Sequence, residues 1–293
     1  MIRFPPKKIL VAYDLSDVSR MAWRHARALA ARCGAALEVV YVKPWQMGVD
    51  LMPPLDLTAG EVQAHLAKIH LEVGSGPAIT VLSGDPAERI LGFSRLHRTD
   101  MIVVGTHGRN GLRRALLGST AEAVVRGSRV PVLIACGRVR PIRSILAPVN
   151  FTSYSEQGFT YAAAASAALA AGLKVLHVTD DPIWSGNLQN RLSTLIRRLP
   201  AGALLRCKPT VEAVVGDAVN GILRAKRGQD WIVLVAHRKS LIKDAFFGTT
   251  LEQVLRRSSI PVLSVPSSSR FHFALRVGSG RGSGVRERSF SLQ

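Results

Sequence analysis

Cysteine and aromatic residues are both scarce in this chain of 293 residues. Its three cysteines, Cys33, Cys136 and Cys207, stand far apart and form no CxxC pair. This spacing argues against a disulfide framework or a zinc site and suits a protein of the reducing cytosol. Aromatic residues make up 6% of the chain and hydrophobic residues 47%, so alanine, valine and leucine supply most of the core. Such side chains suit helices packed closely on a buried sheet.

A long apolar run is missing as well. Residues 1–8 contain no apolar centre of the kind that signal peptides have. The stretch 162–173, made of small apolar residues, is too short and too rich in alanine to span a bilayer. We therefore expect a cytoplasmic protein without membrane insertion.

Acidic residues are about half as common as basic ones. The chain has 39 Lys and Arg against 20 Asp and Glu, which gives a formal net charge of +19. An excess of this size attracts phosphates, nucleic acid or an anionic membrane face. A genome that favours arginine codons is the alternative explanation. Because the sequence has no helix-turn-helix, RRM or zinc-finger signature, we do not expect nucleic acid as a partner.

An internal repeat organises the chain. Five sequence blocks occur twice in the same order, and each pair has matching apolar and turn residues. The blocks begin at Lys8, Leu37, Gly84, Asp100 and Ser128 in the first copy and at Ser144, Leu173, Gly216, Asp230 and Ser258 in the second. The sequence therefore predicts two domains of one fold, 1–137 and 141–267, joined by a short basic linker.

Each copy alternates short β-branched runs with helical patterns. In the first copy the predicted strands are 9–13, 37–42, 79–82, 101–104 and 130–135, and the clearest helices are 19–33 and 61–73. A third helix is predicted to start with Asp85 as N-cap, Pro86 in the first turn and Glu88 at the third position. This alternation predicts an α/β fold with a parallel sheet covered by helices on both faces.

Residues 268–293 differ in character from both copies. They are rich in Arg, Gly and Ser, and we expect a flexible basic tail. Within the tail, residues 271–277 alternate apolar and polar side chains with period two, so a short edge strand is the alternative there.

The first copy carries a glycine pattern that can hold phosphates. Gly105 and Gly108 follow the fourth predicted strand, and Gly118-Ser119-Thr120 opens a helix nine residues later, which gives G-x-x-G-x9-G-S. Glycines let backbone N–H groups approach an anion, and a helix N-terminus favours negative charge. Turn glycines without a ligand are the alternative interpretation.

Asp14 stands at the end of the first predicted strand. If the first and fourth strands are neighbours, Asp14 and Gly105 flank one crevice at the carboxyl ends of the sheet. A carboxylate there can accept hydrogen bonds from ribose hydroxyls or an adenine amine. The alternative is that Asp14 is the N-cap of the helix that follows.

Catalytic constellations are lacking. The sequence has no nucleophile elbow, no HExxH, no closely spaced pair of carboxylates and no Walker lysine after the glycine pattern. An enzyme is therefore not expected, beyond slow ATP hydrolysis at most.

These motifs together resemble the universal stress protein family of the A type. The resemblance is carried by residues 9–16, 105–112, 117–121 and 130–133, and it covers 5–137 well and 141–266 more weakly. It implies two tandem five-stranded parallel sheets of order 3-2-1-4-5, a Rossmann-like fold of the adenine nucleotide alpha hydrolase type. It also implies a nucleotide-responsive stress factor. There are two alternatives: an interaction protein of the same fold that binds no nucleotide, and a slow ATP hydrolase.

The resemblance also implies a cofactor and its binding residues. ATP, with Mg²⁺ on its phosphates, would be held by Ala12, Asp14, Val42, Val104, Gly105, His107, Gly108, Gly118, Ser119 and Thr120. The alternative role for His107 is a hydrogen bond within its loop, because His237 keeps the same place in the second copy. Family dimers often pair through the fifth strand, here 130–135 and 260–265. This implies an intramolecular pseudo-dimer of the two domains, and a homodimer is the further option.

The second copy departs from the glycine pattern. Aligning Gly248 with Gly118 puts Val235 at the place of Gly105 and Arg238 at the place of Gly108. Asn150 replaces Asp14. Since side chains then stand where backbone should approach phosphate, we expect only the first domain to bind ATP.

Overall fold

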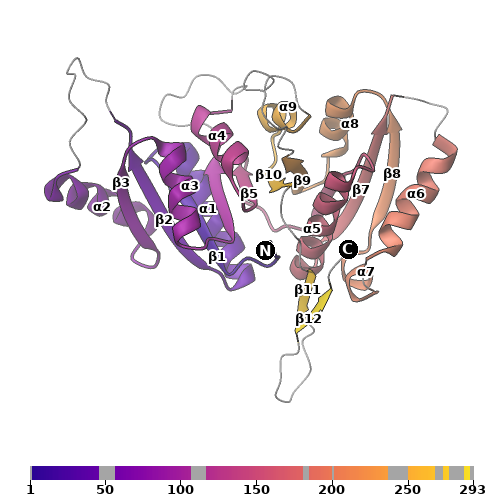
Figure 1. Cartoon of the computed structure of the whole chain (residues 1–293), viewed down its shortest axis with the longest axis horizontal. Coiled ribbons are helices and arrows are strands. Elements are labelled where there is room, and N and C mark those ends of the chain that lie inside the picture. The colour runs from indigo at the N-terminus through magenta and orange to yellow at the C-terminus, as the bar shows by residue number, and fades with distance from the viewer. Residues whose placement is uncertain are drawn as a thin grey trace. The chain divides into compact units, whose positions relative to one another are not determined.

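The computed structural model describes residues 2–45, 57–106, 117–180, 185–199, 201–236, 250–267, 273–276 and 287–290. Contacts between residues divide the chain into two units (Figure 1). We call Pro6–Val139 the N-terminal unit. The C-terminal unit consists of Arg140–Gln293 together with Met1–Pro5.

The N-terminal unit contributes five strands to a sheet, in the order β3-β2-β1-β4-β5. Its strands are β1 (Lys8–Tyr13), β2 (Ala36–Lys43), β3 (Ala78–Ser83), β4 (Met101–Gly105) and β5 (Val132–Ala135). All neighbouring pairs are parallel, so the expected order 3-2-1-4-5 is confirmed. β5 begins two residues later than the sequence suggested, because the Ser128 hydroxyl bonds to both the N–H and the C=O of Val130 and holds it in a turn.

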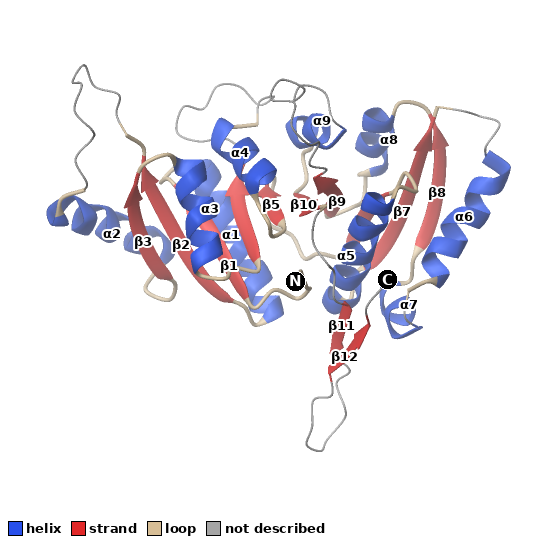
Figure 2. Ribbon diagram, viewed as in Figure 1, coloured by secondary structure: helices blue, strands red, loops and turns tan. Residues whose placement is uncertain are grey.

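Helices of the described residues cover these strands (Figure 2). They are α1 (Asp17–Cys33), α2 (Ala59–Val73), α3 (Pro86–Leu96) and α4 (Ser119–Gly127). Because β1 to β3 advance in one direction and β3 to β5 in the other, right-handed crossovers put α1 and α2 on one face and α3 and α4 on the other. The Asp85 carboxylate caps α3 by accepting from the Glu88 N–H at 2.8 Å, as predicted.

The C-terminal unit has the same strand order, β8-β7-β6-β9-β10, again with parallel neighbours. Its strands are β6 (Ser144–Pro148), β7 (Gly172–Thr179), β8 (Thr210–Val215), β9 (Trp231–Ala236) and β10 (Val262–Pro266). Its helices are α5 (Ser153–Leu169), α6 (Ser185–Arg197), α7 (Ala201–Cys207), α8 (Ala218–Ala225) and α9 (Thr250–Arg257). The central strands of both units are buried on both faces, which explains their continuous apolar sequences.

Two short strands lie beyond the repeat. β11 (Phe273–Arg276) pairs antiparallel with β12 (Glu287–Phe290) in a separate two-stranded sheet. The backbone of β11 lies near α5. The alternating pattern of 271–277 offered an edge strand as the alternative to a flexible tail. The structure has a strand there, but it pairs with β12 within the tail and not with a parallel sheet.

An aspartate holds the beginning of the first strand in each unit. The Asp100 Oδ2 atom accepts from the backbone N–H groups of Lys7 and Lys8, at 2.8 and 3.0 Å. In the C-terminal unit, Asp230 Oδ2 accepts from Arg143 and Ser144 at 2.8 and 3.1 Å. The matched aspartates of the repeat therefore join the amino ends of two neighbouring strands.

The residues at the N-terminus pack on the C-terminal unit. Phe4 is 1% exposed, and its ring meets that of Tyr161 on α5 edge to face, with centroids 5.7 Å apart. The sequence assigned residues 1–5 to the first domain, whereas their contacts group them with the second unit. The reason is that the buried ring of Phe4 packs on Tyr161 and so holds these residues on the C-terminal unit.

A buried histidine links α1 to the carboxyl end of β5. His25 is 8% exposed, and its Nε2 atom lies 3.2 Å from the carbonyl oxygen of Gly137. Burial lowers the pKa of this imidazole below its usual value, because the charged form is poorly solvated.

We expect His25 to make the stability of the N-terminal unit sensitive to mild acid. As pH falls below about 6.5, the unfolded chain takes up a proton that the folded chain resists, so stability falls from there toward the folded-state pKa. The His25→Gln variant keeps a donor for Gly137 and does not titrate. Its urea midpoint should fall less than that of the wild type between about pH 7 and pH 5.

The matched control is His70→Gln, because His70 is exposed on α2. It should follow the wild-type pH dependence. Equal losses of stability in the wild type and in His25→Gln would contradict the assigned role of His25.

Candidate functional site

The described residues of the predicted nucleotide site lie at the carboxyl ends of β1, β2 and β4 and at the start of α4. They are Ala12, Asp14, Val42, Val104, Gly105, Gly118, Ser119 and Thr120. β1 pairs with β2 on one side and with β4 on the other, so the neighbour relation that brings Asp14 and Gly105 to one edge is confirmed. His107 and Gly108 lie outside the described residues.

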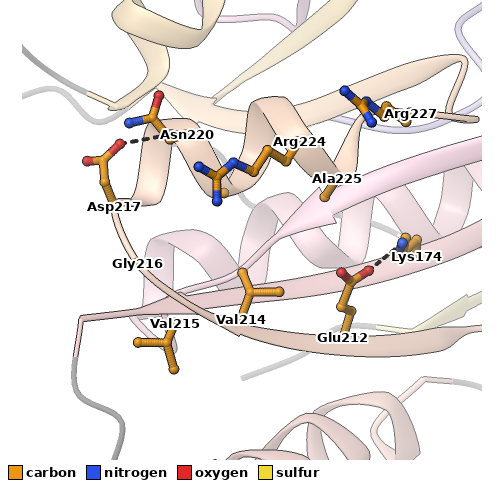
Figure 3. Close-up of a pocket in the computed structure, with 11 residues that line it drawn as sticks. Lys174, Glu212, Val214, Val215, Gly216, Asp217, Asn220, Arg224, Ala225 and Arg227 are labelled. Carbon is orange, nitrogen blue, oxygen red and sulfur yellow. Dashed lines mark hydrogen bonds and ion pairs between the residues drawn. The ribbon is translucent and has the colours of Figure 1, made fainter.

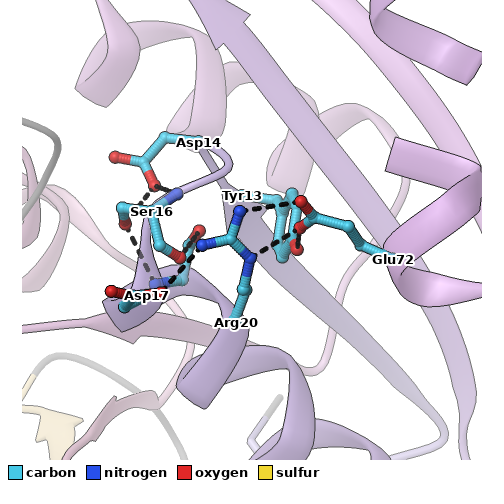
Figure 4. Close-up of polar contacts among 7 residues, drawn as sticks. Tyr13, Asp14, Ser16, Asp17, Arg20 and Glu72 are labelled. Carbon is cyan, nitrogen blue, oxygen red and sulfur yellow. Dashed lines mark hydrogen bonds and ion pairs between the residues drawn. The ribbon is translucent and has the colours of Figure 1, made fainter. Parts of the chain in front are cut away.

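Asp14 shapes the turn that leads from β1 into α1 (Figure 4). Leu15 has a left-handed backbone with φ of 64°, and Asp14 Oδ1 accepts from the backbone N–H of Ser16 at 3.0 Å and from its hydroxyl. The Ser16 hydroxyl oxygen in turn accepts from the Ser19 N–H at 3.1 Å. The N-cap of α1 is therefore Ser16, and the alternative that Asp14 is the N-cap is wrong.

The C-terminal unit builds the same turn without a charge. Asn150 Oδ1 accepts from the N–H and the hydroxyl of Thr152, at 3.3 and 2.7 Å, and Thr152 caps α5. Phe151 between them has φ of 58°. Because an amide oxygen serves this turn as well as a carboxylate oxygen, the negative charge of Asp14 is not needed for the turn. Its Oδ2 atom has no hydrogen bond to another described residue.

A cluster of charged side chains lies beside this turn and joins α1 to α2 (Figure 4). Arg20 donates to both carboxylate oxygens of Glu72, at 3.0 and 2.7 Å, and to Asp17 at 2.8 Å. The Tyr13 hydroxyl also donates to Glu72. Arg20 holds the pKa of Glu72 below its usual value, while burial and then Glu72 raise the pKa of Tyr13. Each of these charged groups already has a partner within the cluster. We therefore assign the cluster a structural role, which is to hold α1 and α2 in place.

The corresponding ion pair in the C-terminal unit has reversed signs. Glu156 occupies the place of Arg20 in the repeat, and it pairs with Arg198 near the end of α6 at 3.2 Å. The first helix of each unit is thus joined to its second helix by one ion pair, with the cation on α1 in one unit and after α6 in the other. The motif analysis missed this pair.

Gly105 is required by packing whether or not a ligand binds. A Cβ atom at this position would lie 2.6 Å from Val18 Cγ1 and 2.9 Å from the Val18 carbonyl oxygen, at the start of α1. The first turn of α1 therefore sits directly against the end of β4. The C-terminal unit also has a glycine where its first helix meets its fourth strand, but the glycine lies on the helix. Gly158 of α5 lies four residues after Tyr154, the counterpart of Val18, and a Cβ atom at Gly158 would lie 2.5 Å from Val235 Cγ2 on β9.

This exchange corrects the interpretation of Val235. Its side chain packs against α5 at Gly158, and in the N-terminal unit Ala22 occupies the place of Gly158. The loss of glycine at 235 therefore has a packing reason, and it is not evidence that phosphate is excluded. Arg238, Gly248 and Thr249 lie outside the described residues. A comparison of the two copies position by position, Gly105 with Val235 and Ala22 with Gly158, could have revealed this exchange.

The start of α4 is open. Its N-cap is Gly118, which has φ of −64° and ψ of 145° and supplies no side-chain cap, whereas Ser16, Thr58 and Asp85 each cap their helix. The Gly118 N–H donates to the Thr106 carbonyl at 2.7 Å. Ser119 is exposed, so donors of the first turn face solvent at the positive end of the helix dipole.

Two units of order 3-2-1-4-5 place the chain in the Rossmann-like class of α/β folds. The family model described as "Universal stress protein family" matches residues 5–135 and 141–266. The chain belongs to the universal stress protein family, with two tandem family domains.

Individual relatives agree with this assignment. A universal stress protein of Methanocaldococcus jannaschii is 34% identical over 143 residues, which cover 44% of this chain and 81% of that protein. A universal stress protein of Synechocystis is 24% identical over 88% of this chain and 99% of its own length. Among solved structures, one of a universal stress protein from Archaeoglobus fulgidus has a TM-score of 0.69 at 20% identity and covers 89% of this chain and 96% of that one.

Two other features are absent from the described residues. They contain no helix that is both long and apolar enough to cross a membrane. They also contain no group of three or more His, Cys, Asp and Glu side chains arranged to hold a metal ion.

We expect the contact between Gly158 and Val235 to carry a measurable energy. Gly158→Ala adds a Cβ atom against Val235 Cγ2 and should lower the free energy of unfolding by about 1–3 kcal/mol. Val235→Ala removes that Cγ2 atom. The double variant should therefore be more stable than the sum of the single effects predicts, with a coupling of about 0.5–3 kcal/mol in urea unfolding.

Gly60→Ala on α2 is the matched control. No atom lies within 4 Å of a Cβ atom built at Gly60, so this substitution should be neutral or stabilising. If Gly158→Ala were tolerated as well as Gly60→Ala, the packing explanation for Val235 would fail.

Proposed function

We propose that this tandem universal stress protein binds ATP in its N-terminal unit and acts as a nucleotide-responsive stress factor. One observation carries the proposal. At the carboxyl edge of adjacent strands, the spare charge of Asp14 and the uncapped start of α4 offer complementary partners for a nucleoside and for phosphates. This is the edge at which open parallel sheets bind ligands.

The nucleoside would lie between the ends of β1 and β2. Ala12 is half-buried and Val42 is 7% exposed, so both present small apolar surface to a base. Asp14 Oδ1 is held by Ser16, which leaves Oδ2 to accept from a ribose hydroxyl or an adenine amine. A carboxylate that is already oriented by its own turn loses little entropy on binding.

The phosphates would lie at the start of α4. Gly118 has no Cβ atom to obstruct an anion, and the N–H groups and hydroxyls of Ser119 and Thr120 follow it. An uncapped helix N-terminus with these donors suits a phosphate, so the residues present fit this group. Val104 and Gly105 would form the strand end beside it, and Mg²⁺ is expected to accompany the phosphates.

The C-terminal unit is expected to bind no ATP. Asn150 keeps the turn but offers no charge to the nucleoside, and the sequence puts Arg238 at the place of Gly108, where backbone should approach phosphate. We therefore propose one ATP per chain.

A second function has specific support. Gly105 packs against Val18, and Asp14 holds the turn through Ser16, so each has a structural role without a ligand. An interaction protein of the same fold that binds no nucleotide would keep both residues. ATP titration separates the two functions.

We expect Gly118→Val combined with Ser119→Ala to abolish ATP binding, because a branched side chain would then occupy the space proposed for the phosphates. Thr249→Ala in the C-terminal unit should change the affinity little. Isothermal titration calorimetry with Mg²⁺ and ATP should give one site per chain. Two equivalent sites, or binding retained by the double variant, would overturn the proposal.

Asp14→Asn separates the binding role of this residue from its structural role. The amide oxygen should keep the turn, as Asn150 does, so the melting temperature should stay near that of the wild type. The affinity for ATP should fall about tenfold, since hydrogen bonds to a charged group are stronger than neutral ones. Asp14→Ala should lower both the melting temperature and the affinity for ATP. Unchanged ATP affinity in Asp14→Asn would assign Asp14 to the turn alone.

A further inference from the structure

A pocket of about 440 Å³ lies in the C-terminal unit between α8 and the strands β7 and β8 (Figure 3). The ion pair of Lys174 and Glu212 lines it on the strand side. Asn220, Arg224 and Arg227 line it on the helix side. Its volume falls in the range of about 300–1,000 Å³ that small-molecule sites occupy.

The N-terminal unit has large side chains where this pocket lies. The helices α3 and α8 correspond residue by residue from their capping aspartates, Asp85 and Asp217, and Ile90 and Ile222 are both 3% exposed. Four positions that line the pocket differ in size or charge between the two helices. They are Glu88 and Asn220, Arg89 and Gly221, Gly92 and Arg224, and Phe93 and Ala225.

Two of these exchanges replace a large side chain with a small one. In the N-terminal unit the Arg89 side chain lies across Gly84, with its Nε atom 2.7 Å from the ideal Cβ position of that glycine. Phe93 is 8% exposed and stacks on His97, with ring centroids 3.7 Å apart. Alanine at 225 leaves room, whereas Val178 fills the space beside Gly221, with its Cγ2 atom 2.7 Å from a Cβ atom built there. Apart from the chain neighbours, no described atom lies within 4 Å of a Cβ atom built at Gly216, the counterpart of Gly84.

A third exchange adds a cation to the pocket. In Figure 3 the Arg224 side chain lies between α8 and β8. In the part of the chain that the structure describes, neither the Arg224 nor the Arg227 guanidinium has a hydrogen bond or ion pair. Both carboxylates of the pocket are engaged, Glu212 by Lys174 and Asp217 by the backbone N–H of Asn220 at 2.8 Å.

A fourth cation contributes at the edge. The Arg257 Nη2 atom donates to Asn220 Oδ1 at 2.9 Å. The amide oxygen of Asn220 is therefore occupied, and its N–H groups remain as donors. The pocket thus combines hydrogen-bond donors with an excess of positive charge, since Lys174, Arg224 and Arg227 face two carboxylates, Glu212 and Asp217.

We propose that this pocket binds a small organic anion that carries more than one phosphate or carboxylate group. Guanidinium groups match both kinds of oxyanion in geometry and charge. The aliphatic side chains of Val214 and Ala225, which also line the pocket, suit a short carbon skeleton. This site is separate from the proposed ATP site, which is formed by residues of the N-terminal unit.

The test uses the full chain and two probes, inorganic pyrophosphate and citrate, titrated by calorimetry at constant ionic strength. Arg224→Glu combined with Arg227→Glu should weaken the tighter-binding probe at least about tenfold. Arg197→Glu combined with Arg206→Glu is the control, because both arginines are exposed on α6 and α7 and the charge change is the same. The control should stay within about twofold of the wild type.

A second variant closes the pocket without changing charge. Ala225→Phe restores the residue that the N-terminal unit has at this place, and it should abolish binding while the melting temperature stays near that of the wild type. Preference for pyrophosphate or for citrate identifies the anionic group. Failure of both probes to bind, or equal binding by the wild type, the reversed pair and Ala225→Phe, would overturn the proposal. Neither result depends on ATP binding, since an anion at the start of α4 would be unaffected by these substitutions.

Discussion

The contact between the first helix of each unit and the end of its fourth strand governs the carboxyl edge of the sheet. A side chain must be missing where helix and strand approach closely. The glycine lies on the strand in one unit, at Gly105 against Val18, and on the helix in the other, at Gly158 against Val235. The turn before the helix then follows, with Asp14 or Asn150 holding the capping hydroxyl. Because the helix cannot move away without losing this contact, the strand ends and the turn form one rigid edge.

Much of the fold could be predicted from the sequence because the repeat and the apolar runs are local signals. Five strands per unit, their order and the Asp85 cap all agree with the structure. The predictions that the structure corrects concern places where a side-chain hydroxyl bonds to nearby backbone. Ser128 turns the chain just before β5, and Ser16 takes the capping role considered for Asp14. Hydroxyl bonds of this kind depend on backbone angles that composition does not reveal.

The sequence predicted where the residues of the candidate site lie, but it revealed only some of the roles that these residues have. Asp14 and Gly118 lie at the expected edge, yet Gly105 has a packing role that the phosphate-loop interpretation did not contain. The basis of that role is a distance between residues far apart in sequence, Val18 and Gly105, which no single motif records. The pocket on α8 is similar, because the replacement of Phe93 by Ala225 has a meaning only once the two helices are superimposed in the fold. Comparing the two copies residue by residue recovers part of this information from sequence.

The reversed ion pairs also bear on how the two units avoid exchanging parts while the chain folds. A tandem repeat brings two similar sheets together on one chain at high local concentration, which favours docking of a helix from one copy onto the other. Here such an exchange would set Arg20 against Arg198 and Glu72 against Glu156. Each incorrect pairing places like charges together, whereas each native pairing is attractive. Opposite polarity therefore favours the native pairing of each second helix with the first helix of its own unit.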